Sequence, residues 1–171
     1  PLKFYDSENE FQLAGIPIEG CACDNIVVRI FLDLKHEFEL PPQNIYLYKR
    51  IPTGAGLGGG SSDGAFMMRM LNEQFHLGMS GAEMEERMSC YGADCAFFIR
   101  NTPSLAEGIG DRIRPLHLDL SKYWILLVKP SVSVSTKEAY ADIEPQKPSV
   151  NLYEALMQPV EKWRHTICND F

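Results

Sequence analysis

Long apolar runs are absent from this sequence of 171 residues. The longest is YWILLV at Tyr123–Val128, which has the length of a buried strand, whereas a membrane-spanning helix needs about 20 apolar residues. A leader built from a basic, an apolar and a small-residue region is also absent, so nothing argues for secretion. We therefore expect a cytoplasmic protein with no membrane partner.

Basic residues are in the minority. The chain has 16 Lys and Arg residues against 23 Asp and Glu residues, which gives a formal net charge of −7. This balance disfavours nonspecific binding to nucleic acid, because the phosphates of the nucleic acid repel an acidic surface. It still allows a phosphorylated ligand that backbone amides and one or two local cations receive.

The cysteines do not form the pattern of a disulfide framework. The five cysteines are odd in number and scattered, which suits reduced thiols better than disulfides. Cys21 and Cys23 form a C-x-C pair, but the nearest imidazole is His36 and no second cysteine pair is near. Because structural zinc normally takes about four ligands at motif spacing, we predict no metal site made by the side chains.

The composition that is present is globular, with 45% hydrophobic and 23% charged residues. The length suits one compact domain, or one domain and part of another. Strand and helix patterns are mixed, so we expect an α+β fold with domains at residues 1–116 and 117–171. Both ends look cut, since residue 1 already lies in strand-like sequence, and we expect a fragment of a longer protein.

Apolar periodicity and capping signals predict helices and a strand in the first part of the chain. Asp24 is expected to cap a helix whose apolar face comprises Ile26, Val27, Ile30, Phe31 and Leu34. A strand follows at residues 44–51. The next helix is expected from Ser61, with a buried face of Phe66, Met67, Met70, Leu71 and Phe75. A third is expected over residues 80–91, with Ser80 as its cap and Glu83 in its first turn.

The second part of the chain is expected to hold one hairpin, one strand and several helices. A polar hairpin is predicted within residues 104–116 and a buried interior strand at residues 122–130. Helices are expected near Ser135 and from Asn151 onward.

Residues 52–65 read PTGAGLGGGSSDGA and hold five glycines between Gly54 and Gly60. Glycine allows positive φ and close backbone approach, so successive N–H groups can converge on one anion at the helix start. The alternative is a flexible hairpin or linker. The loop lacks the lysine of G-x-x-x-x-G-K-[ST], and G-x-G-x-x-G occurs without an acidic residue at a second strand end. These features predict a phosphate-binding loop of neither common type.

The loop resembles the second signature of the GHMP kinases, and further segments resemble that family in the same order. They are DNIVVRI at residues 24–30, GADCAFF at residues 92–98, AEGIGDRIRPL at residues 106–116, KPSVSVST at residues 129–136 and NDF at residues 169–171. The resemblance covers nearly the whole chain. It implies a GHMP kinase fold, with the ATP-binding N-terminal domain at residues 1–116 and the start of the C-terminal domain at residues 117–171.

The triple-glycine form of the loop is typical of one branch of the family. The resemblance to it implies that ATP and Mg²⁺ are used to phosphorylate the C2 hydroxyl of cytidine diphosphate-linked methylerythritol, in the non-mevalonate isoprenoid pathway. The ATP phosphates are then expected at Pro52, Thr53, Gly54, Ala55, Gly56, Leu57, Gly58, Gly59, Gly60, Ser61 and Ser62. We expect a monomer or a weak homodimer.

Individual roles follow from the same resemblance. Asp94 matches the catalytic aspartate, although an aspartate here could also be a cap or turn residue. Asn25 matches a position near the adenine and could equally start a helix. Lys49 could face the nucleotide or be solvated at a strand edge. Thr136 and Tyr140 match the substrate side, where an aromatic ring stacks on cytosine; a buried tyrosine is the alternative.

The sequence departs from the family pattern in several places. Ala96 and Ser135 replace prolines, and Gly64 replaces alanine. The N-terminal P-A-K-x-N segment, the D-G-[YF]-H segment and the C-terminal glycine-rich motif are missing, so we expect little or no kinase activity from these residues alone. Two alternatives stay open: a kinase of another small alcohol, and a nucleotide-binding module without catalysis.

Overall fold

The computed structural model describes residues 2–5, 9–130, 136–141, 143–144, 146 and 149–169. The chain divides into two compact units, Pro1–Pro115 and Leu116–Phe171. Each unit is described by itself.

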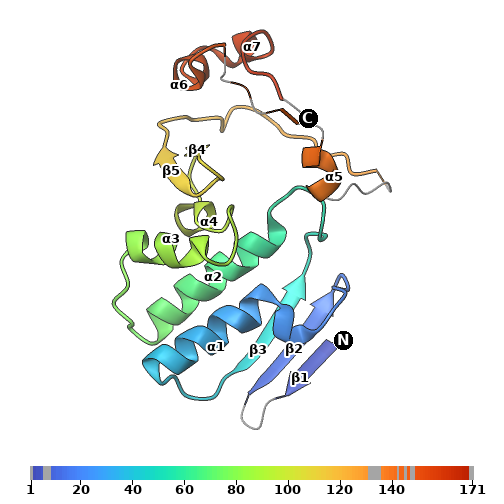
Figure 1. The fold of residues 1–171 in the computed structure, drawn as a ribbon, viewed down its shortest axis with the longest axis vertical. Helices are drawn as coiled ribbons and strands as arrows, with labels where there is room; N and C mark the ends of the chain where they lie inside the picture. The colour runs from blue at the N-terminus through green and yellow to red at the C-terminus, as the bar shows by residue number, and fades with distance from the viewer. Residues whose placement is uncertain are drawn as a thin grey trace. The chain divides into compact units, whose positions relative to one another are not determined.

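The first unit combines a three-stranded sheet with helices and a separate hairpin (Figure 1). Its elements are β1 (Leu2–Tyr5), β2 (Glu10–Gly15), the 3-10 helix η1 (Ala22–Asp24), α1 (Ile26–Phe38), β3 (Asn44–Lys49), α2 (Gly59–Gln74), α3 (Gly81–Ser89), α4 (Phe97–Arg100), β4 (Ser104–Glu107) and β5 (Arg112–Pro115). The predicted hairpin is confirmed, because β4 and β5 pair antiparallel.

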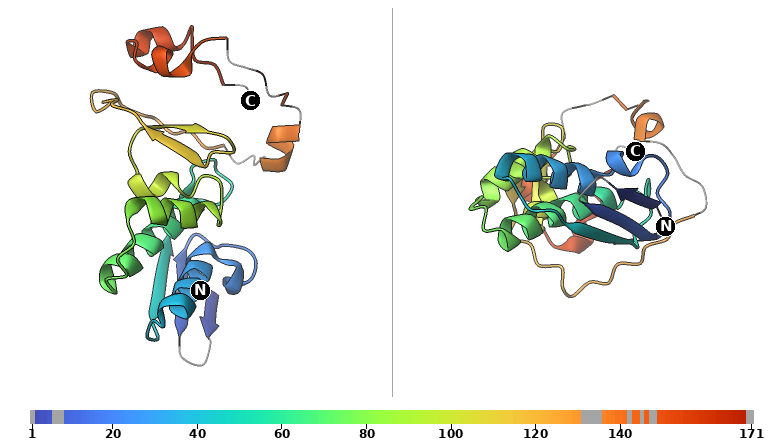
Figure 2. Two further views of the ribbon diagram at one scale, coloured as in Figure 1. Left: turned by 60° about the vertical axis from the view of Figure 1, so that its left-hand side comes forward. Right: turned by 90° about the horizontal axis from the view of Figure 1, so that it is seen from below.

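The sheet has the strand order β1-β2-β3, with β1 antiparallel and β3 parallel to β2. Helix α1 makes the crossover that two parallel strands require. Alternation along β3 turns Ile45 toward the helices, whereas Tyr46 and Tyr48 lie on the other face and are 63% and 58% exposed. The two views of Figure 2 show α1 and α2 together on one face. The sequence patterns did not predict β2, although its alternation was available as a signal.

Helix α1 buries the expected apolar face, but its cap is one residue further along the chain than predicted. The buried residues are Val27, Val28, Ile30, Phe31 and Leu34. The predicted cap, Asp24, is wrong because Asp24 ends η1. Asn25 has the extended backbone of an N-cap, and its Oδ1 accepts a hydrogen bond from the Val27 N–H at 3.0 Å.

Helix α2 is turned differently from the prediction. Phe66 and Met70 were expected to be buried, but each is 51% exposed. The side of α2 that faces α1 contains small residues instead: a Cβ built on Gly64 would lie 3.0 Å from the Cδ1 atoms of Ile26 and Ile30. Gly64 therefore allows the two helices to approach closely, and this approach explains why glycine suits the position.

Helix α3 forms as predicted. The Ser80 Oγ accepts from the Glu83 N–H at 3.2 Å, and the Glu83 Oε2 accepts from the Ser80 N–H at 2.7 Å. This reciprocal pair is a capping box, and it lowers the pKa of Glu83 because the hydrogen bonds favour the carboxylate. Arg87 joins α3 to α1 through two hydrogen bonds of 2.6 Å to Glu37.

The second unit contains α5 (Thr136–Ala141), α6 (Leu152–Leu156) and α7 (Val160–Trp163). The interior strand predicted at residues 122–130 is wrong: those residues form no strand, and Trp124 is 100% exposed. A strand needs a neighbour for its N–H and C=O groups, and the described residues of this unit supply none. The helix predicted near Ser135 is confirmed, because α5 begins at Thr136; Ser135 itself lies outside the described residues. None of the helices that the structure describes is long and apolar enough to cross a membrane.

The cysteine prediction is wrong for one pair. Cys21 and Cys23 form a disulfide, because η1 brings their Cα atoms to 5.2 Å. Cys90, Cys95 and Cys168 are free thiols. Asp24 lies beside this pair, with its carboxylate within 4.8 Å of both sulfur atoms, but sulfur atoms joined in a disulfide are not thiolate ligands for a metal.

The Gly64 contact gives a test of the α1–α2 packing. Gly64→Val should lower the free energy of unfolding by about 1–3 kcal/mol, because a branched side chain would overlap Ile26 and Ile30. Urea denaturation followed by circular dichroism measures the change. Gly81→Val is the matched control, since a Cβ at Gly81 meets no atom within 4 Å, and it should change stability by less than about 0.5 kcal/mol. Equal effects of the two variants would contradict the close packing.

Candidate functional site

The glycine-rich loop joins the end of β3 to the start of α2. Gly54, Gly56 and Gly58 all have positive φ, at 69°, 69° and 62°. Gly58 is the N-cap residue of α2 and makes no side-chain cap, and the first helical bond runs from the Ser62 N–H to the Gly58 carbonyl at 2.8 Å. The N–H groups of the first turn therefore have no intrahelical partner and point toward the loop, which is the arrangement that receives an anion.

One side of the loop is open, and the other side is packed against the protein. Cβ atoms built on Gly54, Gly56 and Gly60 would meet nothing within 4 Å. A Cβ on Gly58 would instead lie 2.5 Å from the Phe98 ring. A ligand can thus approach the loop backbone from outside while α4 supports it from behind.

Lys49 lies behind the loop and not at its open surface. It is the last residue of β3, it is 3% exposed, and its Nζ lies 2.5 Å from the Asp63 Oδ2. A Cβ on Gly59 would lie 3.2 Å from that Nζ. Of the two interpretations drawn from the sequence, a solvated lysine is wrong, and the side chain is paired with Asp63 on the protein side of the loop.

Asp94 precedes α4 and is exposed. The turn between β4 and β5 packs against it, because a Cβ on Gly110 would lie 3.3 Å from the Asp94 Oδ1. The next residue, Cys95, is buried, and the side chain of the loop residue Ser61 is one of the groups that act on the pKa of its thiol. The structure therefore brings Asp94, Gly110 and the loop residue Ser61 into one neighbourhood.

The surroundings of Cys95 shift the pKa of its thiol. Burial raises the pKa of its thiol, the hydrogen bond with Ser61 acts in the opposite direction, and the Asp94 carboxylate raises it further. The net direction is upward, so the thiol form is favoured. Cys95 is a packing residue between α4 and α2 and not an activated nucleophile.

Asn25 lies at the start of α1. Its Oδ1 is engaged in the helix cap, and the adjacent Ile26 packs against Gly64 near the start of α2. The cap fixes the orientation of the side chain. Asn25 thus serves the structural role that the sequence analysis held open, at a position next to the helix that carries the loop.

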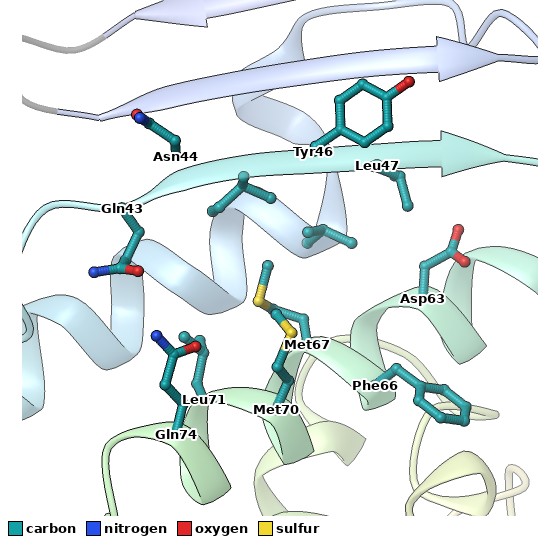
Figure 3. A pocket seen from close by; sticks show the side chains of 12 residues that line it. Gln43, Asn44, Tyr46, Leu47, Asp63, Phe66, Met67, Met70, Leu71 and Gln74 are labelled. Carbon is teal, nitrogen blue, oxygen red and sulfur yellow. The ribbon is translucent and has the colours of Figure 1, made fainter.

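A groove of about 600 Å³ lies between β3 and α2 (Figure 3). Met67, Met70 and Leu71 line its helix side, and Asp63 lies at one end, where its carboxylate points toward β3. None of the predicted phosphate-loop residues lines this groove. It is a separate feature from the loop surface.

The predicted substrate residues Thr136 and Tyr140 belong to α5 of the second unit, where Tyr140 is 60% exposed. The sequence analysis missed two residues of the site, Asp63 as the partner of Lys49 and Gly110 as the neighbour of Asp94. The signal for Asp63 was an acidic residue early in α2, and nothing in the sequence alone connected Gly110 to Asp94.

Comparisons with known proteins find similarity to one family. Residues 25–101 match the family described as GHMP kinases N terminal domain. This segment contains the loop, Asp94 and Asn25. This segment is therefore similar to the N-terminal domain of the GHMP kinases, and the expected α+β fold is confirmed.

Two curated relatives of the chain carry the same name. The chain is 49% identical over 168 residues to the 4-diphosphocytidyl-2-C-methyl-D-erythritol kinase of Bacteroides fragilis, with 97% of this chain and 61% of the relative covered. It is 43% identical over 165 residues to that of Cytophaga hutchinsonii, with 96% and 61% covered. The chain therefore spans 61% of the length of these relatives.

A solved structure is also similar. The crystal structure of 4-(cytidine 5'-diphospho)-2C-methyl-D-erythritol kinase is 33% identical to the chain, with a TM-score of 0.51 over 63% of this chain and 39% of the other. This likeness extends the agreement from the sequence to the arrangement of the elements.

The environment of Cys95 predicts slow alkylation. At pH 8, iodoacetamide should modify the exposed Cys90 and Cys168 at least about tenfold faster than Cys95, because burial and the raised pKa keep Cys95 as a thiol. Peptide mass spectrometry of timed samples measures the three rates. Denaturation in guanidinium chloride should make the rates similar. Rapid modification of native Cys95 would show that it is not packed between α4 and α2.

Proposed function

We propose that the full-length gene product is an ATP-dependent kinase that phosphorylates an alcohol. The observation that carries the proposal is the meeting of an open, amide-lined loop with the carboxylate of Asp94, through the contacts of Cys95 with Ser61 and of Gly110 with Asp94. A phosphoryl transfer needs both parts, one to hold the donor phosphates and one to accept the proton of the acceptor hydroxyl.

The roles of the chain's own residues follow from their positions. Within residues 52–62, the backbone N–H groups of residues 53–61 hold the phosphates of ATP at the start of α2, because Pro52 has no N–H and the Ser62 N–H is bonded to the Gly58 carbonyl; Asn25 lies on the adenine side. Asp94 takes the proton of the acceptor hydroxyl. The oxygen of that hydroxyl bonds to the γ-phosphorus, while the bond between the γ-phosphorus and the leaving oxygen of ADP breaks. The hydroxyls of Ser61 and Ser62 and the Asp94 carboxylate are hard oxygen donors, which fit Mg²⁺. When bound, Mg²⁺ would neutralise part of the negative charge of the ATP phosphates.

The substrate proposal rests on the relatives. We infer that the alcohol is the C2 hydroxyl of cytidine diphosphate-linked methylerythritol, because the relatives are named as kinases of 4-diphosphocytidyl-2-C-methyl-D-erythritol. Residues 1–116 would be the ATP-binding domain and residues 117–171 the start of a second domain, in which Thr136 and Tyr140 contact the substrate. Tyr140 is exposed and could stack on the cytosine ring.

The two alternatives make different predictions in one assay. The full-length gene product is supplied with ATP, Mg²⁺ and, separately, the cytidyl-linked alcohol, mevalonate and homoserine. Phosphorylation of the first alcohol supports the proposal. Transfer only to mevalonate or homoserine would indicate another kinase of the family, and ATP binding without transfer would indicate a binding module.

Asp94→Asn tests the catalytic carboxylate. We expect kcat to fall by about 10²- to 10⁴-fold, because the amide cannot accept the proton, while the KM for ATP stays within about threefold. Coupled detection of ADP measures both constants. Asp119→Asn is the matched control, since Asp119 is an exposed carboxylate of the second unit that accepts a hydrogen bond from the Ser121 N–H at 2.9 Å and has no proposed role. A kcat that survives in Asp94→Asn would exclude Asp94 as the base.

A further inference from the structure

The ion pair between Lys49 and Asp63 joins the two ends of the glycine-rich loop. Lys49 is the last residue of β3, and Asp63 lies in the second turn of α2. Their side chains meet at 2.5 Å, with exposed fractions of 2% for Lys49 and 26% for Asp63. The whole loop therefore lies between two residues that are held together directly.

The position of the ammonium is unfavourable for the helix itself. The start of a helix has a partial positive charge, so a cation is disfavoured there, yet the Lys49 Nζ lies against Gly59, the first residue of α2. Asp63 supplies the counter-charge. Replacing a buried ion pair with apolar residues is often neutral for stability, so stability alone does not account for this arrangement.

The surroundings limit where the ammonium can go. A Cβ on Gly59 would lie 2.7 Å from the Ile51 Cγ2 and 3.2 Å from the Lys49 Nζ, so the first turn of α2 is packed directly on the side chains of both residues. Cβ atoms built on Gly54, Gly56 and Gly60 would meet no atom within 4 Å, whereas the Lys49 side chain is only 2% exposed. A ligand that approaches the open amides therefore meets the loop backbone before it could reach Lys49.

We propose that Lys49 and Asp63 are a positioning pair that fixes the end of β3 against the start of α2 and so orders the loop before ATP binds. The proposal rests on the proposed function for its kinetic consequence. It differs from the interpretation of Lys49 as a direct phosphate ligand, because in a positioning pair both partners matter equally.

Two variants distinguish these roles in the full-length gene product. Lys49→Met and Asp63→Asn should each raise the KM for ATP by about tenfold and leave kcat within about threefold, and the double variant should be no worse than either single one. If Lys49 bound phosphate directly, Asp63→Asn would free the ammonium, and the affinity for ATP would stay the same or improve. That result, or unchanged KM in both variants, would overturn the proposal. Lys122→Met is the matched control, since Lys122 is exposed and lies in the second unit.

A second measurement does not depend on catalysis. Hydrogen exchange of the amides of residues 53–60, measured without nucleotide, should be at least about tenfold faster in Lys49→Met than in the unaltered protein or in Lys122→Met. Circular dichroism shows whether each variant is folded. If the unaltered protein neither binds nor uses ATP, the proposed function fails, and the exchange rates still decide whether the pair orders the loop. Equal exchange rates in Lys49→Met and the unaltered protein would overturn the proposal that the pair orders the loop.

Discussion

The start of α2 rests directly on the end of β3, and the candidate site depends on this contact. Lys49 reaches under the first turn to Asp63, and the absence of a side chain at Gly59 lets Ile51 and the ammonium approach the helix backbone. On the far side, Gly64 lets α1 come equally close. Because Gly59 and Gly64 have no side chains, the end of β3 and helix α1 both pack closely against α2. The N–H groups of its first turn face the open side of the loop.

A fixed helix start matters because an amide cradle works only when its donors already point at one place. Hydrogen bonds from a loop that must first be ordered lose the entropy of that ordering, roughly 1–2 kcal/mol for each backbone residue. Three positive-φ glycines make the loop geometry possible but do not enforce it, since glycine is also the most flexible residue. The packing of Gly58 on Phe98 and the ion pair beside Gly59 restrict the loop to this conformation.

The sequence predicted correctly those parts of the fold that depend on interactions between residues close together in the chain. The capping box of Ser80 and Glu83 and the apolar face of α1 depend on residues a few positions apart, and both formed as expected. The exposure of Phe66 could not be predicted, because the helix turns its small residues toward α1. Residues 122–130 have the composition of an interior strand, but a strand also requires a partner. In the same way, the motifs pointed to the loop and Asp94, whereas the Asp63 and Gly110 contacts join segments that no pattern connects.

The contact between Gly110 and Asp94 has a consequence for how this sequence can vary. The glycine has a φ of 103°, and a Cβ built on it would lie 3.3 Å from the Asp94 Oδ1, which is a tight contact. A side chain at that turn would push the carboxylate away from the loop, and the strained backbone would add its own cost. The residue types at positions 94 and 110 are therefore coupled by packing. Among related sequences, a change at one should appear together with a change at the other.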